Sequence, residues 1–160
     1  MGKPSIAAVN GPAIGAGFGL ALACDIRLAS PAARFGATFI AMGLVPDYGV
    51  SYFLPRVVGT STALELLLTG RMVDAEEARA LGIVSRVEED VVGAAVELAI
   101  TIAAHPPHAT GITRANVYRS MELDLETEVL EQEPRSQAVA LFGSEFPERF
   151  AAWTRKIQGR

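Results

Sequence analysis

Residues 5–24 have the sequence SIAAVNGPAIGAGFGLALAC, and this segment sets the expected architecture. Ile6–Val9 is a short, uninterrupted apolar run, which is typical of a buried strand. The Asn-Gly-Pro sequence at residues 10–12 ends that strand with a turn. The later half of residues 14–23 is rich in leucine and alanine, so we expect a helix there. A strand that leads into a helix favours an α/β fold.

The same segment carries no charge between residues 5 and 24, a length that could span a membrane. Asn10, Pro12 and the glycines argue against a lipid-exposed helix, because they leave backbone groups poorly satisfied in hydrocarbon. Lys3 alone is a weak basic region for a secretory signal. The single cysteine, Cys24, excludes an internal disulfide framework and suits a reducing compartment. We therefore expect no membrane span and a cytoplasmic location.

The whole chain has 160 residues, of which 50% are hydrophobic and 20% charged, and its formal net charge is −4. This length is enough for one domain with its own hydrophobic core. The hydrophobic content argues against disorder. A nucleic-acid-binding domain would carry a basic excess, whereas 14 basic side chains stand against 18 acidic ones here. The composition therefore predicts a folded protein that does not bind nucleic acid.

Further strands are predicted early in the chain and helices later. Residues 25–29 alternate polar and apolar side chains, and residues 34–36 and 83–87 are two more strand candidates. Residues 41–48 form a predicted loop, because glycine and proline interrupt them. The expected helices are 52–57, one through 63–68 that Gly70 ends, one from Asp74 to Gly82, 90–104, 109–121, 124–141 with a kink or division at Pro134, and Phe146–Ile157.

Three signals make specific predictions about how these helices begin. Thr60 or Ser61 is expected to cap the helix that follows. Asp74 and Glu77 have the spacing of a capping box, in which two side chains satisfy backbone N–H groups reciprocally. Pro55 must lie in the first turn of its helix or bend it, because a proline ring clashes with the preceding turn.

The glycine run Gly15-Ala16-Gly17-Phe18-Gly19 lies between a predicted strand and a predicted helix. Backbone N–H groups at such a helix start can stabilise an anion or a developing oxyanion. The alternative is structural, since small residues also allow a helix to pack closely. The spacing is not that of the dinucleotide fingerprint, which also needs an acidic residue about twenty positions further on.

Two other groups of side chains carry candidate chemistry. Asp47, beside Pro46, lies in a loop where a carboxylate could act as a general acid or base. On spacing alone, a cap for the helix near Gly49 is the favoured interpretation of Asp47. His105 and His108 have no metal-ligating residues close in sequence, so no metal site is expected.

The C-terminal end combines an aromatic ring with basic side chains. Arg155 and Lys156 lie close to Trp153, and such a group can hold an adenine ring and phosphates. A solvated terminal helix with one buried tryptophan is the simpler alternative, and these residues alone favour it.

These motifs occur in a characteristic order along the chain. The stretches concerned are residues 3–11, 15–17, 24–27, 33–36, 43–47, 54–59, 68–71, 75–78 and 82–84. In this order they resemble the crotonase (enoyl-CoA hydratase/isomerase) superfamily over essentially the whole chain. The resemblance implies an α/β fold, a partial crotonase-type spiral of strand-strand-helix units. Residues 1–105 would be the C-terminal part of the crotonase core, and residues 106–160 a helical region for trimerisation that also covers CoA.

By resemblance, the family binds acyl-CoA thioesters and holds the thioester oxygen, as an enolate, between two backbone N–H groups. Ala16 matches one of these donors, and Gly15, Gly17 and Pro46 are assigned to substrate binding beside it. The resemblance implies no cofactor other than coenzyme A as part of the thioester substrate. It also implies a homo-oligomer, either a trimer or a hexamer.

The chain departs from the family's hydratases at both of their carboxylates. Those enzymes carry one glutamate just after the glycine run and a second one a few residues after the Phe-Gly pair. The matching positions here are Gly19 and Phe39, and neither side chain can move a proton. Some family isomerases instead use an aspartate in the loop that Asp47 matches. We therefore expect enoyl-CoA isomerase-type proton transfer through a thioester enolate, with Asp47 as the catalytic side chain.

Two alternatives stay open. One is a non-catalytic or truncated crotonase-like module that binds acyl-CoA or serves assembly, and the other is enoyl-CoA hydratase (lyase) activity. The family's chains continue well upstream of the Lys-Pro strand, so the resemblance implies a fragment or a second polypeptide that supplies the rest. By the same resemblance, Trp153 takes the place of a phenylalanine near the adenine pocket. Arg155 and Lys156 fall on basic positions near the CoA phosphates.

Overall fold

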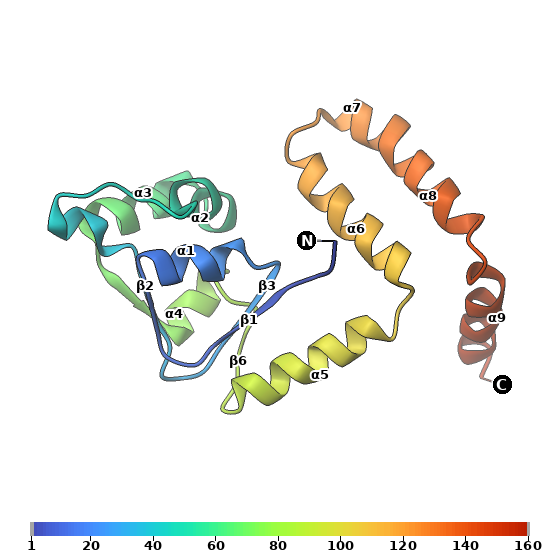
Figure 1. Cartoon of the computed structure of the whole chain (residues 1–160), viewed down its shortest axis with the longest axis horizontal. Coiled ribbons are helices and arrows are strands. Elements are labelled where there is room, and N and C mark those ends of the chain that lie inside the picture. Colours follow the sequence, from blue (N-terminus) through green and yellow to red (C-terminus); the bar gives the residue numbers. More distant parts are fainter. Residues whose placement is uncertain (1, 160) are drawn as a thin grey trace. The chain divides into compact units, whose positions relative to one another are not determined.

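The computed structural model describes residues 2–159, and these residues form two compact units (Figure 1). The first unit is Pro4–Thr101, and the second consists of residues 102–159 together with residues 2 and 3. The length alone predicted one domain, whereas the packing divides the chain near the end of its longest apolar helix. Among the described residues, no helix is both long and apolar enough to cross a lipid bilayer.

A parallel sheet lies in the first unit. Its strands are β1 (Ile6–Val9), β3 (Ile26–Ala29) and β6 (Arg86–Val87), in the order β1-β3-β6. The Asp25 carboxylate accepts hydrogen bonds from the Ser5 backbone N–H (2.7 Å) and hydroxyl (2.8 Å), which ties the starts of β1 and β3 together. The strands predicted at 6–9 and 25–29 are confirmed to within one residue. The strand predicted at 83–87 is wrong in extent, because only its last two residues pair.

A second sheet contains two strands that the sequence did not predict. β2 (Pro12–Ile14) pairs in parallel with β4 (Arg34–Gly36), and β5 (Met72–Asp74) is antiparallel to β4. The predicted strand at 34–36 is therefore confirmed as the centre of this sheet. β2 begins at a proline, which a sheet accepts at the first residue of an edge strand. Both missed strands have three residues, too few for a hydrophobic period to show.

Helices follow the strands in the first unit. They are α1 (Ala16–Ala23), the 3₁₀ helix η1 (Thr38–Met42), α2 (Val50–Val58), α3 (Thr60–Thr69), α4 (Ala75–Ala80) and α5 (Val91–Ala103). Pro55 is the sixth residue of α2 and therefore lies beyond its first turn, so of the two predicted alternatives the bend is the one that stays open. Gly59, and not Thr60 or Ser61, is the N-cap of α3, because the helix begins one residue earlier than the cap prediction required. Gly70 ends α3 in the left-handed conformation, as expected.

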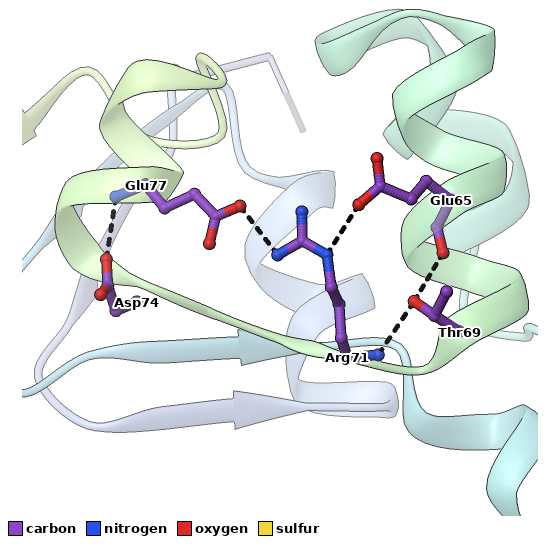
Figure 2. Close-up of polar contacts among 5 residues, drawn as sticks. All are labelled: Glu65, Thr69, Arg71, Asp74 and Glu77. Atoms are coloured by element: carbon purple, nitrogen blue, oxygen red, sulfur yellow. Dashed lines mark hydrogen bonds and ion pairs between the residues drawn. The ribbon is translucent and has the colours of Figure 1, made fainter.

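The start of α4 shows how short elements are held in place (Figure 2). Asp74 is the N-cap, and its Oδ1 accepts a hydrogen bond from the Glu77 N–H at 2.9 Å. The Glu77 carboxylate is paired with Arg71 at 2.8 Å, and Arg71 Nε also bonds Glu65 at 2.8 Å. These hydrogen bonds raise the pKa of the Arg71 guanidinium, and the bond to Glu77 contributes more than the bond to Glu65. The Asp74 half of the predicted capping box is therefore confirmed. The reciprocal half is wrong, because the side chain of Glu77 pairs with Arg71 and so joins α4 to α3.

The core of the first unit forms where the helices cover the second sheet. Phe18 of α1 and Phe35 of β4 are almost fully buried, and their ring centroids are 5.7 Å apart. Val50 and Leu54 of α2 are fully buried against the same cluster. Burying side chains of this size contributes about 1.5–3 kcal/mol each, so this cluster fixes how α1 and α2 pack.

The second unit is helical. It contains α6 (Pro107–Ser120), α7 (Leu125–Thr127), a π-helical turn η2 (Glu128–Gln132), α8 (Glu133–Leu141) and α9 (Phe146–Ile157). The segment predicted as a helix at 124–141 changes from π to α geometry at Glu133, but its helical turns continue from Leu125 to Leu141. The kink predicted at Pro134 stays a prediction. An open cavity of about 540 Å³ lies between α6, η2 and α8. The predicted roles of 1–105 as a core region and 106–160 as an oligomerisation region stay predictions.

Candidate active site at the start of helix α1

The turn between β2 and α1 is built around Gly15. Its backbone has φ 55° and ψ −116°, a combination that residues with a Cβ rarely adopt. Its N–H donates to the Gly36 carbonyl oxygen at 2.8 Å, so the turn is anchored to β4. Its own carbonyl oxygen accepts the Gly19 N–H at 3.0 Å, the first hydrogen bond of α1. The glycine is therefore required by the backbone and not only by packing.

Ala16 is the first residue of α1, and it is exposed to solvent. The N–H groups of the first residues of a helix have no carbonyl partner within it, and they lie at the positive end of the helix dipole. The Ala16 amide is therefore available to a negatively charged oxygen. Gly17 is also exposed, and a Cβ placed on it would meet nothing within 4 Å, so packing does not explain this glycine.

Phe39 lies against this turn. A Cβ on Gly15 would stand 3.6 Å from Phe39 Cζ, and the phenylalanine is only 7% exposed. The ring therefore forms an apolar wall directly beside the exposed start of α1. It can exclude water there, but it carries no group that transfers a proton.

Gly19 brings a distant loop onto α1. A Cβ on Gly19 would lie 2.6 Å from the Tyr48 carbonyl oxygen and 2.8 Å from Tyr48 Cβ, closer than real atoms approach. The 43–49 loop therefore packs on the helix backbone itself. Gly19 is three residues beyond Ala16, about 4.5 Å along the helix axis. The residue before Tyr48 is Asp47, so the backbone next to this carboxylate packs on α1 about one helical turn from Ala16.

Asp47 does not cap α2. The N-cap is Gly49, and what Asp47 contributes there is its backbone carbonyl, which accepts the Val50 N–H at 3.0 Å. The interpretation as a cap, favoured on spacing alone, is wrong because two consecutive left-handed residues, Tyr48 (φ 47°) and Gly49 (φ 78°), turn the chain between Asp47 and the helix. Asp47 is exposed, and within residues 2–159 its carboxylate has no recorded hydrogen bond or ion pair. The side chain is thus available for chemistry.

Exposed apolar side chains lie in the same loop as Asp47 and on α1 next to Gly19. Leu20 follows Gly19 on α1 and is 70% exposed, and Tyr48 is 68% exposed. Leu44 and Val45 of the same loop are also exposed, and Pro46 is half-buried. Exposed apolar residues gathered around a polar group are a common property of ligand sites.

Trp153, Arg155 and Lys156 belong to α9 in the second unit. Trp153 is 58% exposed, so the alternative of one buried tryptophan is wrong. Its ring stacks on Phe150 with centroids 6.0 Å apart, and Phe150 stacks on Phe146 at 5.5 Å. Arg155 and Lys156 lie in the last turn of the helix, where cations suit the helix dipole. Helix α9 thus carries a row of three stacked aromatic rings, and two exposed cations stand in its last turn.

Metal-binding residues do not gather in the part of the chain that the structure describes. No group of three or more His, Cys, Asp or Glu side chains in residues 2–159 is arranged to hold an ion. His108 lies against the backbone at Gly143, within the helical unit. The candidate site itself combines the Asp47 carboxylate, backbone amides at the start of α1 and apolar side chains.

Proteins of known families are similar to this chain in sequence. A family model described as "Enoyl-CoA hydratase/isomerase" matches residues 1–151. A probable enoyl-CoA hydratase of Mycobacterium tuberculosis is 41% identical over 154 residues, which cover 94% of this chain and 54% of that protein. A 4-chlorobenzoyl coenzyme A dehalogenase of Arthrobacter sp is 36% identical over 156 residues, which cover 96% of this chain and 56% of that protein.

Solved structures agree. A probable enoyl-CoA hydratase/isomerase from Mycobacterium abscessus has a TM-score of 0.90 and 40% identity, covering 98% of this chain and 61% of the other. A putative enoyl-CoA hydratase from Thermobifida fusca, solved in complex with CoA, has a TM-score of 0.81 and 40% identity, covering 85% of this chain and 53% of the other. The chain therefore belongs to the enoyl-CoA hydratase/isomerase family of the crotonase superfamily. It spans little more than half the length of these relatives.

Sequence reasoning located the turn at Gly15 and the carboxylate at Asp47, but it missed what joins them. The contact between Gly19 and Tyr48 connects residues 29 positions apart. The left-handed conformation of Tyr48 also had no signal in the sequence, since tyrosine rarely adopts it. The glycine following Tyr48 was the available indication of a tight turn.

Proposed function

We propose that this chain carries the acyl-CoA site of a crotonase-family protein and that its reaction is the isomerisation of an enoyl-CoA thioester. The observation that carries the proposal is an exposed Asp47 carboxylate, without a capping role, on a loop packed on α1 near the Ala16 amide. A proton carrier beside an oxyanion-stabilising donor is what enolate chemistry requires.

In the proposed reaction, the Asp47 carboxylate removes a proton from the carbon next to the thioester carbonyl. The electron pair of that C–H bond forms an enolate, and its charge rests on the thioester oxygen. The Ala16 N–H donates a hydrogen bond to this oxygen. Asp47 then returns the proton to the far carbon of the double-bond system, so that the double bond moves and the carboxylate is regenerated. Typical oxyanion holes use more than one donor, and Ala16 would supply one of them.

Hydration is the second candidate, because several relatives are named enoyl-CoA hydratases. Addition of water needs a group that activates the water molecule. Gly19 has no side chain and meets the Tyr48 backbone, while Phe39 is a buried aromatic ring. These two positions therefore support isomerisation over hydration.

The test compares wild type with Asp47→Asn on 3-enoyl-CoA and 2-enoyl-CoA. We expect isomerisation of the 3-enoyl thioester by the wild type and a fall in kcat of about 100- to 10,000-fold in Asp47→Asn, the usual contribution of a general acid or base. Glu97→Gln removes an exposed carboxylate on α5 and serves as the matched control, with unchanged kcat. Release of chloride from 4-chlorobenzoyl-CoA is measured in parallel, because one relative is named for that substrate.

Other outcomes of this experiment would change the assignment. Hydration of 2-enoyl-CoA that survives in Asp47→Asn would replace isomerisation by hydratase activity. Binding of CoA without turnover of any thioester would favour the remaining hypothesis, a non-catalytic module that binds acyl-CoA or serves assembly.

Coenzyme A is the proposed ligand of α9, and a neighbour solved with CoA supports its presence in this fold. Trp153 would stack on the adenine ring, and Arg155 and Lys156 would pair with the phosphates. By analogy with stacking on nucleic-acid bases, worth about 1–3 kcal/mol, Trp153→Ala should raise the Kd for CoA about tenfold. Trp153→Phe keeps a flat ring and should lose much less. Calorimetric titration of the full chain measures both, and equal affinity of all three proteins would contradict this placement.

A further inference from the structure

The contact between Gly19 and Tyr48 has consequences for where Asp47 stands. Gly19 is buried within α1, and the atoms that a Cβ would meet there are the Tyr48 carbonyl oxygen (2.6 Å), Cβ (2.8 Å) and carbonyl carbon (3.2 Å). Apart from the Cβ these are backbone atoms, so they cannot turn aside as the end of a flexible side chain would. Any residue other than glycine at position 19 must push the Tyr48 backbone away from the helix by roughly 1 Å to regain normal contact.

We propose that Gly19 is a positioning residue. Its lack of a side chain lets the turn at residues 47–49 close on α1, and this closure holds the Asp47 carboxylate at its working distance from the start of the helix. The inference rests on the proposed function for its catalytic meaning, but the structural coupling can be measured without any substrate.

The far side of the turn is fixed as well. Gly49 has φ 78°, and a Cβ there would stand 2.8 Å from the Phe53 ring. Val50 follows directly and is fully buried, and its N–H is bonded to the Asp47 carbonyl oxygen at 3.0 Å. The turn is thus held between the core on one side and Gly19 on the other. A displacement at Gly19 has to be taken up by residues 47 and 48.

The backbone of Tyr48 is strained in this turn. It has φ 47°, a left-handed conformation that is unfavourable for a bulky side chain and persists only where the surroundings over-determine it. Strain of this kind concentrates next to functional groups. Here it lies directly beside Asp47, and Tyr48 atoms occupy the space that a side chain on Gly19 would fill.

Gly17 provides a matched comparison in the same helix. Both residues are helical glycines two positions apart, but a Cβ on Gly17 meets nothing within 4 Å. Alanine is the better helix former, so replacing a helical glycine normally stabilises a protein. We therefore expect opposite signs: Gly17→Ala should raise the midpoint of urea unfolding, and Gly19→Ala should lower it.

The experiment follows amide hydrogen exchange in the full chain. The Val50 N–H reports on the turn through its bond to Asp47. Gly19→Ala should speed its exchange about tenfold through local opening, whereas Gly17→Ala should leave it unchanged. With 3-enoyl-CoA, Gly19→Ala should lower kcat by about 100-fold while KM changes little, because a misplacement of about 1 Å costs this much. Glu97→Gln is the control for turnover.

A second variant protects the test against misfolding. Tyr48→Gly removes the Cβ, which is one of the clashing atoms, and makes the left-handed turn easier to shift, although the carbonyl oxygen remains. Combining it with Gly19→Ala should therefore recover part of the stability that Gly19→Ala loses. A double variant no more stable than Gly19→Ala alone would overturn the proposal, and so would unchanged Val50 exchange in Gly19→Ala. Failure of the isomerase assignment has a different signature, since Asp47→Asn would then leave turnover intact while the exchange result still held.

Discussion

Asp47 is used differently from other aspartates that stand near the starts of helices. Asp74 accepts the Glu77 N–H at 2.9 Å, and Asp124 accepts the Thr127 N–H at 2.9 Å. Asp47 instead offers only its backbone carbonyl to Val50. The first two therefore stabilise the fold, whereas the Asp47 carboxylate is left for other work. The distinction matters because spacing alone favoured a cap for Asp47 as well as for Asp74.

Replacing Asp74 should test the structural role. Asp74→Ala removes the cap of α4 and should lower the free energy of unfolding by about 1 kcal/mol, the usual contribution of such a residue. Asp74→Ser keeps an acceptor and should lose little. Urea unfolding measures both, with Asp47→Asn as the comparison that should leave stability unchanged. An equal loss in Asp74→Ser would show that the hydrogen bond is not the source.

Asp124 predicts a pH dependence at the start of α7. Hydrogen bonds from the Thr127 hydroxyl (2.7 Å) and N–H hold the pKa of this carboxyl below its ordinary value of 3.8. Because the folded pKa is the lower one, the stabilisation is present above the unfolded pKa and is lost as pH falls through the folded pKa. Helix content followed by circular dichroism should therefore fall more steeply below about pH 4 in wild type than in Asp124→Asn. Parallel acid curves for the two proteins would contradict this.

At the level of elements, prediction succeeded where the signal was local. β1, α5 and α9 have continuous or periodic apolar patterns, and all three occur within one or two residues of their predicted bounds. β2 and β5 were missed because they exist through pairing with β4, and three residues carry no period of their own. Tertiary pairing therefore defined the sheet that supports the Gly15 turn.

The candidate site divides in the same way. The glycine run and the Pro-Asp loop are visible in the sequence, because their residue types are unusual at those places. The joining of Gly19 to Tyr48, and the Phe39 ring beside Gly15, depend on packing between segments that only the fold brings together. The cap interpretation of Asp47 failed for the same reason: its neighbours in sequence suggested a cap, whereas in the fold Gly49 is the N-cap of α2.

At the scale of the whole molecule, the helical unit leaves large apolar side chains in contact with solvent. Leu130 is 66% exposed, Val139 60% and Phe142 91%. Monomeric proteins rarely leave apolar side chains gathered on the surface, whereas interfaces between subunits cover them. A homo-oligomer, a trimer or a hexamer, is therefore the proposed state of the protein, and this unit is the proposed interface.

Sedimentation of the purified chain tests that state, since an oligomer must sediment at a multiple of 16.9 kDa. Val139→Lys places a charge where the proposed interface would exclude water, so it should shift the equilibrium towards the single chain without unfolding it. Gln137→Lys adds the same charge at another exposed position of α8 and serves as the control. If the wild type has the mass of a single chain at all concentrations, the proposed interface is contradicted. An oligomer that Val139→Lys leaves intact would place its contacts elsewhere.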